Sequence, residues 1–160
     1  MSKIKIRKAT VEDSALILRF VTELAIYEKA ENEVVATVSD IKDSLFGENS
    51  TTSGVICNIN SEPVGFAVYF LNYSTWLGKH GLYLEDLYIS PDHRGVGAGK
   101  ALLKYLAKIA LFMNCGRFEW SVLDWNEQAI QFYQSIGARP QSEWVGYRLE
   151  GRSLEEFAEG

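Results

Sequence analysis

The stretch Leu82-Tyr-Leu-Glu-Asp-Leu-Tyr-Ile-Ser-Pro-Asp-His-Arg-Gly-Val-Gly-Ala-Gly-Lys-Ala-Leu-Leu103 decides the fold of this chain. Residues 82–89 are rich in Leu, Ile and Tyr and predict a strand, which ends at the turn-forming residues 90–92. Glycine then occupies every second position from Gly95 to Gly99, ahead of an apolar helical pattern. Glycine lets the backbone approach a ligand, and a helix N-terminus carries partial positive charge, so we expect an anion-binding loop here.

Two other kinds of phosphate-binding loop fit this stretch poorly. A P-loop needs four residues between its first glycine and Gly-Lys, followed by Ser or Thr, whereas three residues separate Gly95 from Gly99-Lys100 and Ala101 follows. A dinucleotide-binding loop has the spacing G-x-G-x-x-G directly after a strand, whereas this chain has G-x-G-x-G behind a Pro-Asp-His-Arg turn. The glycines could also simply cap a helix, but three in alternation beside Arg94 exceed what a cap needs.

Length and composition limit the number of domains, the kinds of partner and the kinds of site that we expect. The 160 residues, 47% of them hydrophobic, suffice for one well-packed core and predict a single domain over residues 1–160. The net charge of −5 offers no general basic surface, so no nucleic acid partner is expected. The two cysteines and two histidines lack metal-ligand spacing, so we expect neither a metal site nor a disulfide framework. Without a long apolar run or the apolar core of a signal peptide, the protein is expected to be cytoplasmic, with no membrane partner.

The rest of the chain alternates between strand and helix patterns. Strands are expected at 3–7, 54–59, 64–71, 82–89, 118–123 and 144–149, and helices at 11–29, 41–46, 102–113 and 128–136, followed by a short C-terminal helix capped by Ser153. Residues 54–59 and 64–71 should form a hairpin, and residues 72–81 a loop. Thr10 with Asp13, and Thr37 with Asp40, have the spacing of helix-capping pairs. This order predicts a mixed α/β sheet whose ligand site lies where neighbouring strands end, near Ile89 and Leu123.

Two motifs in this order resemble those of the GNAT superfamily of acetyl-coenzyme A dependent N-acetyltransferases. Arg94-Gly-Val-Gly-Ala-Gly99 matches the family's R/Q-x-x-G-x-G/A pyrophosphate signature, and Asn126-Glu-Gln-Ala-Ile-Gln-Phe-Tyr-Gln-Ser-Ile-Gly137 resembles its later motif. Five further stretches are similar to the spermidine/spermine (diamine) and thialysine acetyltransferase branch: residues 23–28, 64–69, 76–79, 83–86 and 125–127. The similarity extends from Ile6 to about Arg148. One departure is that Gln134, Ser135 and Ile136 stand where that branch often has two basic residues.

The resemblance implies a GNAT-like fold, in which helices flank a mixed, largely antiparallel central sheet. It implies acetyl-coenzyme A as the acyl donor and a homodimer with acceptor sites at or near the subunit interface. The implied acceptor is a small cationic amine, namely a polyamine, a diamine or a thialysine- or lysine-like amino acid. A protein or peptide lysine acetyltransferase and a non-catalytic acyl-coenzyme A binding module remain as alternatives.

Each step of acetyl transfer has a candidate residue. An alkylammonium, with a pKa of roughly 10.4, must lose a proton before it attacks, and Glu85 acting through water is the expected base. Glu85 and Asp86 are adjacent on a strand, so only one can face a given pocket unless a β-bulge intervenes; both could also be ordinary polar edge positions. Tyr133, by its place in the second motif, is the expected general acid for the coenzyme A thiolate. Cys115 lies at a helix end with no histidine nearby in sequence, so we expect direct attack in a ternary complex.

The expected binding residues fall into two groups. Acceptor binding is implied by resemblance for Glu28, Asp86 and Trp76, with Glu31 and Glu33 as weaker companions. The tryptophan could instead pack against the core, and Glu31 and Glu33 could instead be a solvated acidic helix end. Coenzyme binding is expected from the main chain of Leu87, Tyr88 and Ile89, from the pyrophosphate loop of Arg94, Gly95, Val96, Gly97, Ala98, Gly99 and Lys100, and from Asn126 and Tyr133.

Overall fold

The computed structural model describes residues 3–160, in two compact units: one extends to Ser121 and the other runs from Val122 to Gly160. The first contains β1 (Ile4–Lys8), α1 (Ser14–Tyr27), α2 (Val38–Phe46), β2 (Thr52–Ile59), β3 (Glu62–Ser74), β4 (Lys79–Ile89), α3 (Ala98–Phe112) and β5 (Phe118–Trp120), with 3-10 turns at Val11–Asp13, Glu31–Glu33 and Pro91–His93. The second contains α4 (Glu127–Ser135) and α5 (Gly151–Glu159).

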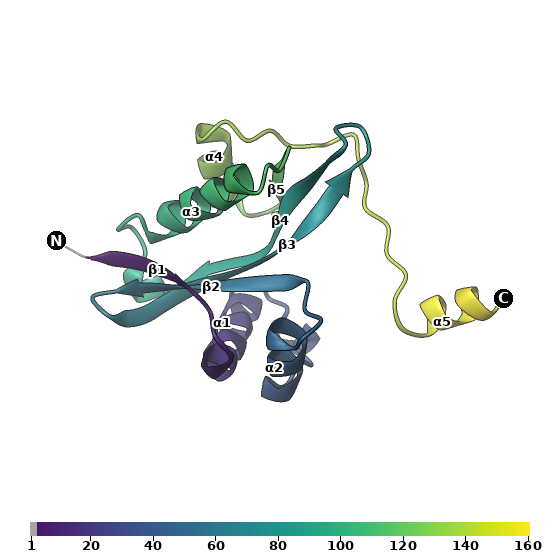
Figure 1. Cartoon of the computed structure of the whole chain (residues 1–160), viewed down its shortest axis with the longest axis horizontal. Coiled ribbons are helices and arrows are strands. Elements are labelled where there is room, and N and C mark those ends of the chain that lie inside the picture. The colour runs from purple at the N-terminus through teal and green to yellow at the C-terminus, as the bar shows by residue number, and fades with distance from the viewer. Residues whose placement is uncertain (1–2) are drawn as a thin grey trace. The chain divides into compact units, whose positions relative to one another are not determined.

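The sheet of the first unit follows the order of the chain, β1-β2-β3-β4-β5. Its first four strands pair antiparallel, whereas β5 pairs parallel to β4. Helices α1 and α2 cover one face of the sheet and α3 covers the other (Figure 1). The expected mixed, largely antiparallel sheet flanked by helices is therefore confirmed.

The β2–β3 hairpin forms where the sequence predicts it. Asn60 and Ser61 both have positive φ, 51° and 70°, as the two central residues of a tight hairpin turn require. The cap of α2 is also confirmed, because the Thr37 N–H donates to Asp40 Oδ2 at 2.8 Å and the Asp40 N–H donates to Thr37 Oγ1 at 3.1 Å. Residues that are neighbours in the chain thus determine the turn between β2 and β3 and the start of α2.

An aromatic cluster fixes α1 against the sheet. The rings of Phe20 in α1 and Phe66 in β3 stack at 5.7 Å between centroids, and the Phe20 ring lies 6.1 Å from that of Tyr88 in β4. All three side chains are buried. Their packing holds the middle of α1 over β3 and β4.

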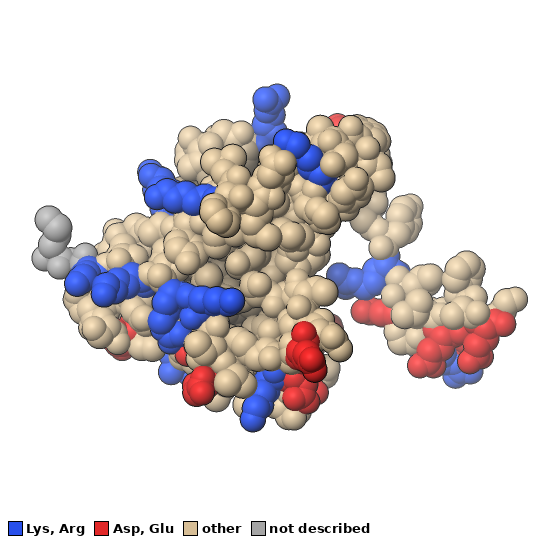
Figure 2. Space-filling model, viewed as in Figure 1, with Lys and Arg blue, Asp and Glu red and all other residues tan. Residues whose placement is uncertain are grey.

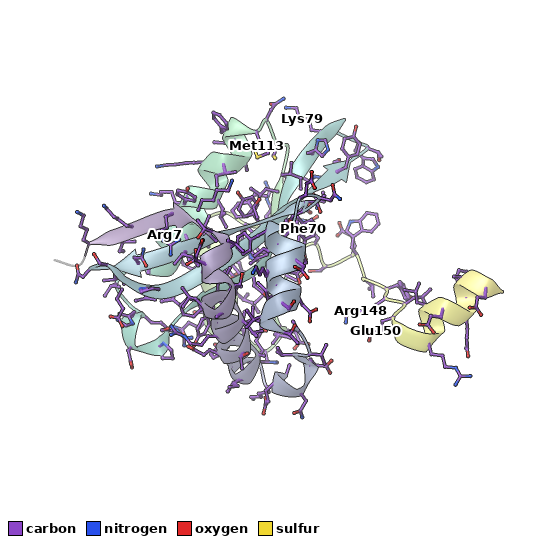
Figure 3. The ribbon with its side chains drawn as sticks, turned by 60° about the horizontal axis from the view of Figure 1, so that its bottom comes forward. Arg7, Phe70, Lys79, Met113, Arg148 and Glu150 are labelled. Atoms are coloured by element: carbon purple, nitrogen blue, oxygen red, sulfur yellow. The ribbon has the colours of Figure 1, made fainter. Side chains whose placement is uncertain are left out.

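A bidentate ion pair joins β1 to the start of α1. Asp13 is buried and accepts from Arg7 Nη1 at 2.7 Å and Nη2 at 2.8 Å, and also from the Thr10 N–H at 2.8 Å. The hydrogen bonds from Arg7 hold the pKa of Asp13 below its ordinary value, against the opposing effect of burial. Figure 3 shows Arg7 on β1.

Three sequence predictions are wrong. Residues 72–81 are not a loop: β3 and β4 continue through them, with Tyr73 paired to His80, and the turn spans only 75–78. Residues 144–149 form no strand in the described chain, since an alternating pattern becomes a strand only beside a partner strand. That irregular segment, which contains Arg148, leads past Glu150 into α5 (Figure 3). The C-terminal helix exists, but Glu150 occupies its N-cap and Ser153 lies inside it.

Surface charge differs between the two units. In Figure 2 the basic side chains of the first unit are spread over several elements, whereas acidic side chains gather on α5 of the second unit, which carries Glu155, Glu156 and Glu159. Within residues 3–160, the model has no helix both long and apolar enough to span a membrane.

Candidate active site

A β-bulge places Glu85 out of register in β4. Asp86 pairs with Val68 of β3, but the next pair toward the turn is Leu84 with Tyr69, so Glu85 is the extra residue. A bulge breaks the strict alternation of side chains along a strand and redirects the extra one. Both carboxylates can therefore serve one site, which a regular strand would not permit.

Three carboxylates meet around this bulge. Burial, followed by the nearby charges of Glu85 and Glu28, raises the pKa of Asp86 to about 6. Burial also raises the pKa of Glu28, at the C-terminal cap of α1. Like charges held together in a partly desolvated place favour an incoming cation. The structure thus brings together Glu28, Glu85 and Asp86, as the sequence predicted for an amine site.

Next to these acids, β4 has an open edge. β5 pairs with β4 only at Leu82, Tyr83 and Leu84, so in the sheet of the described residues 85–89 have no strand partner on that side. The Ser90 N–H donates to Val64 O at 2.8 Å, and main-chain groups alternate sides along an antiparallel strand. Leu87 and Ile89 therefore turn their main-chain groups to the open edge, whereas those of Tyr88 face β3.

The glycine loop follows directly. Gly95 and Gly97 have φ of 82° and 88°, a left-handed conformation that favours glycine, and Gly97 is the N-cap of α3. A Cβ atom at either position would meet nothing within 4 Å, so there is room beside the backbone. Because a glycine cap has no side chain to accept from them, the first N–H groups of this 15-residue helix suit a pyrophosphate group. The loop fits the anion that the sequence predicts.

The Arg94 side chain turns back toward Tyr27 and Tyr88, although the residue is exposed. Its Nε donates to Ile89 O at 2.9 Å, and its Cζ lies 5.2 Å from the ring centroid of Tyr27 and 5.5 Å from that of Tyr88. A direct contact of this guanidinium with coenzyme phosphates therefore stays a prediction. Sequence reasoning missed Tyr27, although it immediately precedes Glu28 at the end of α1.

The second motif lies in the second unit. Asn126 caps α4, because its Oδ1 accepts from the Ala129 N–H at 3.4 Å. Tyr133 lies in the last part of the same helix, where its ring is 5.9 Å from that of Phe132. The roles of Asn126 in coenzyme binding and of Tyr133 as general acid stay predictions.

Trp76 does not join the carboxylates within its own unit. It lies in the turn between β3 and β4 and is 79% exposed. Val68, which pairs with Asp86, is six residues from Ser74 at the end of β3, a span of roughly 20 Å at 3.3 Å per residue. Glu31 and Glu33 are exposed in the 3-10 turn that follows α1, near the chain position of Glu28.

Both cysteines favour the thiol form. Burial raises the pKa of Cys57, which is fully buried in β2, and that of Cys115, which follows α3. Since the thiolate is the nucleophilic form of cysteine, neither environment activates the sulfur.

Comparison with known proteins agrees with this geometry. The family model described as "Acetyltransferase (GNAT) family" matches residues 19–138. Thialysine N-epsilon-acetyltransferase of Sus scrofa is 37% identical, over 99% of this chain and 99% of its own. Human spermidine/spermine N(1)-acetyltransferase-like protein 1 is 34% identical over 98% of this chain, although this chain matches only 24% of that longer protein. A solved V. cholerae integron cassette protein has a TM-score of 0.81 at 29% identity, covering 98% of both chains. The glycine loop, the open edge of β4 and these relatives together show that the chain belongs to the GNAT family and is an acetyl-coenzyme A dependent N-acetyltransferase.

Proposed function

We propose that this enzyme acetylates a primary amine of a small cationic acceptor, either a thialysine- or lysine-like amino acid or a diamine or polyamine. The observation that carries the proposal is the cluster of Glu28, Glu85 and Asp86, beside the open edge of β4. Such a cluster suits an acceptor with positive charge. The names of the similar enzymes, which include thialysine and spermidine/spermine acetyltransferases, support the same class of acceptor.

The first unit supplies the binding groups for the donor. N–H groups between Val96 and Lys100 would hold the pyrophosphate, and the outward main-chain groups of Leu87 with the N–H of Ile89 would pair with the pantetheine arm in the manner of an added strand. Bound acetyl-coenzyme A supplies an activated acetyl thioester. A main-chain N–H on the open edge also stabilises negative charge that develops on the acetyl oxygen.

The acids prepare the acceptor. Asp86 and Glu28 hold the ammonium groups by charge, and Glu85 takes up a proton through water so that one amine becomes neutral and nucleophilic. Tyr133 then gives a proton to the departing thiolate. As the C–S bond breaks and the amide forms, the nitrogen loses its second proton, which replaces the one that Tyr133 gave to sulfur. The products are then the amide, the thiol of coenzyme A and one proton taken up at Glu85.

Direct attack in a ternary complex is supported by the state of the cysteines. An acyl-enzyme route needs an activated thiolate, and burial raises the pKa of both Cys57 and Cys115. Initial-rate plots should therefore intersect when both substrates are varied. Parallel plots, together with acetyl incorporation into the enzyme in the absence of amine, would instead indicate the acyl-enzyme route.

We further propose that the enzyme works as a homodimer with acceptor sites at or near the interface. Large apolar side chains are exposed at the turn end of the β3–β4 hairpin and at the end of α3, including Tyr73, Trp76, Leu77, Leu111 and Phe112. Lys79 Nζ donates to Asn114 Oδ1 at 3.3 Å, which brings these two ends together, as Figure 3 shows for Lys79 and Met113. In such a dimer, Trp76 would contribute to the acceptor site of the partner subunit and not to that of its own subunit. Light scattering during size exclusion measures the mass directly.

An acceptor screen tests the proposed function. The enzyme and acetyl-coenzyme A are combined with thialysine, lysine, putrescine, spermidine or a lysine peptide, and coenzyme A release is followed. We expect the highest kcat/KM with a small amine of the first four. A higher kcat/KM with the lysine peptide would favour a peptide acetyltransferase. Tight binding of acetyl-coenzyme A without turnover on any amine would favour a non-catalytic binding module.

A further inference from the structure

Arg94 bridges two elements that carry different parts of the proposed site. Its guanidinium lies 5.2 Å from the ring centroid of Tyr27, the last residue of α1, and 5.5 Å from that of Tyr88 in β4. Its Nε also donates to Ile89 O at 2.9 Å. One cation thus contacts two aromatic rings and a strand carbonyl, a combination that greatly restricts its rotamers.

Tyr88 is a rigid base for this contact. Its ring is buried beside Phe20, and its hydroxyl donates to Glu23 Oε1 at 3.0 Å. Glu23 Oε2 in turn lies 3.3 Å from Arg19 Nε in an ion pair, one turn earlier in α1. Tyr88 is therefore held in place independently of Arg94, whereas Tyr27, at 41%, is the more exposed of the two rings.

The two ends of this bridge adjoin the two proposed binding sites. Arg94 immediately precedes Gly95 and Gly97, whose positive φ values give the loop its shape. Tyr27 immediately precedes Glu28, whose charge acts on Asp86. Glycine is the most flexible residue, so a loop built on two glycines needs an anchor to keep its N–H groups aligned.

We propose that the ring of Tyr27 is a positioning element that holds Arg94 and thereby couples binding at the glycine loop to binding at the carboxylates. The inference rests on the proposed function, because it assigns the coenzyme to the loop and the amine to the acids. A ligand bound at the loop stabilises the contact of Arg94 with Tyr27, and through it the end of α1. By reciprocity, an amine held at Glu28 strengthens coenzyme binding by the same factor.

The test compares Tyr27→Leu, which removes the aromatic face, with Tyr27→Phe, which keeps it. Calorimetry measures the Kd of coenzyme A, which cannot transfer acetyl, with and without saturating thialysine. We expect Tyr27→Leu to raise this Kd by about 5- to 10-fold and to abolish the effect of thialysine. Tyr27→Phe should keep both the Kd of the unaltered protein and the effect of thialysine on it. Tyr147→Leu, which removes an exposed tyrosine outside both motifs, is the matched control and should also behave as the unaltered protein.

Two results would overturn the inference. One is an unchanged Kd in Tyr27→Leu, and the other is an equal loss in Tyr27→Phe, which would assign the effect to the hydroxyl. A double-mutant cycle with Arg94→Lys adds a second check, since two residues acting through one contact give non-additive losses, and additive losses would also contradict the coupling. If the unaltered protein bound no coenzyme A, the proposed function itself would fail, whereas binding and turnover without any effect of Tyr27→Leu would overturn only this inference.

Discussion

Glu28 at the end of α1 and Asp86 in β4 act on each other electrostatically, although they are far apart in sequence: the charge of Glu28 raises the pKa of Asp86. Burial is the larger cause of that shift, and Glu85 adds to it. Repulsion between nearby carboxylates lowers the stability of the folded chain unless a positive charge offsets it. A cationic amine does so, because its charge lies among the carboxylates only when it is bound.

Asp86→Asn should stabilise the fold at pH 8 by about 2–3 kcal/mol, since a folded pKa of about 6 against an unfolded value of 3.8 corresponds to roughly two pKa units. The folded state holds its proton more strongly, so the destabilisation by Asp86 grows as pH rises from about 4 to 6 and is complete above that. Urea unfolding at pH 8 and pH 4 measures the difference, which should nearly vanish at the lower pH.

The same variant should lose acceptor affinity. We expect the KM of thialysine or spermidine to rise at least about tenfold, because a charge-assisted contact is removed. Asp92→Asn, at an exposed position in the turn before the loop, is the control and should change neither stability nor KM. Destabilisation by Asp86→Asn at pH 8 would show that the carboxylate is paired in the resting protein.

Tyr133→Phe should lower kcat by roughly 10²- to 10⁴-fold and leave the Kd of acetyl-coenzyme A nearly unchanged, since it removes only the proton donor. Steady-state kinetics and calorimetry measure the two quantities separately. Tyr147→Phe, an exposed tyrosine of the same unit outside both motifs, serves as control. Full turnover in Tyr133→Phe would remove this residue from the mechanism.

Gly97→Ala should weaken acetyl-coenzyme A binding by about 5- to 30-fold. The alanine must adopt φ near 88°, which costs about 1–2 kcal/mol, so the loop shifts away from the shape that aligns its N–H groups. Gly99→Ala distinguishes backbone strain from steric blocking of the ligand. It adds the same methyl group without strain, because residue 99 lacks a positive φ and its new Cβ would lie 3.9 Å from Ile89 Cγ1. Equal losses in both variants would indicate that the methyl group blocks the ligand instead.

Asp13→Asn should destabilise the fold at pH 7 by about 1–3 kcal/mol, the range for hydrogen bonds to charged groups, by disrupting the bidentate pair with Arg7. The folded pKa of Asp13 is lowered, so its contribution is present above the unfolded pKa and is lost as pH falls through the folded value. Denaturation across pH 2–7 should show the two proteins converging in acid. Activity with saturating substrates should be unchanged at pH 7.

Local chemistry explains which parts of the fold the sequence predicts. The Asn60-Ser61 turn, the Thr37–Asp40 cap and the glycines before α3 each depend on neighbours in the chain, so their residues reveal them. The β3–β4 pairing through residues 72–81 depends on a partner strand, and the sequence pattern there, with Trp76 and two glycines, favoured a loop. The alternating pattern at 144–149 favoured a strand that does not form, because a strand there would likewise depend on a partner strand.

The candidate site likewise has features that the sequence predicts and features that depend on the tertiary fold. Motif spacing indicated the anion loop, and the position of Glu85 and Asp86 before it indicated an amine site. The bulge that lets both acids serve one site depends on the register between β3 and β4, which no single-strand pattern contains. The contact of Arg94 with Tyr27 likewise joins residues that only the tertiary fold brings together.

The open edge of β4 also bears on solubility. Exposed strand edges are templates on which further chains add, and proteins protect such edges with charged side chains. Glu85 and Asp86 stand at the start of this edge, so the acids proposed to attract an amine also repel the same edge of another copy. Recognition of the acceptor and resistance to aggregation then depend on the same two charges, and replacing both with neutral residues should compromise the two properties together.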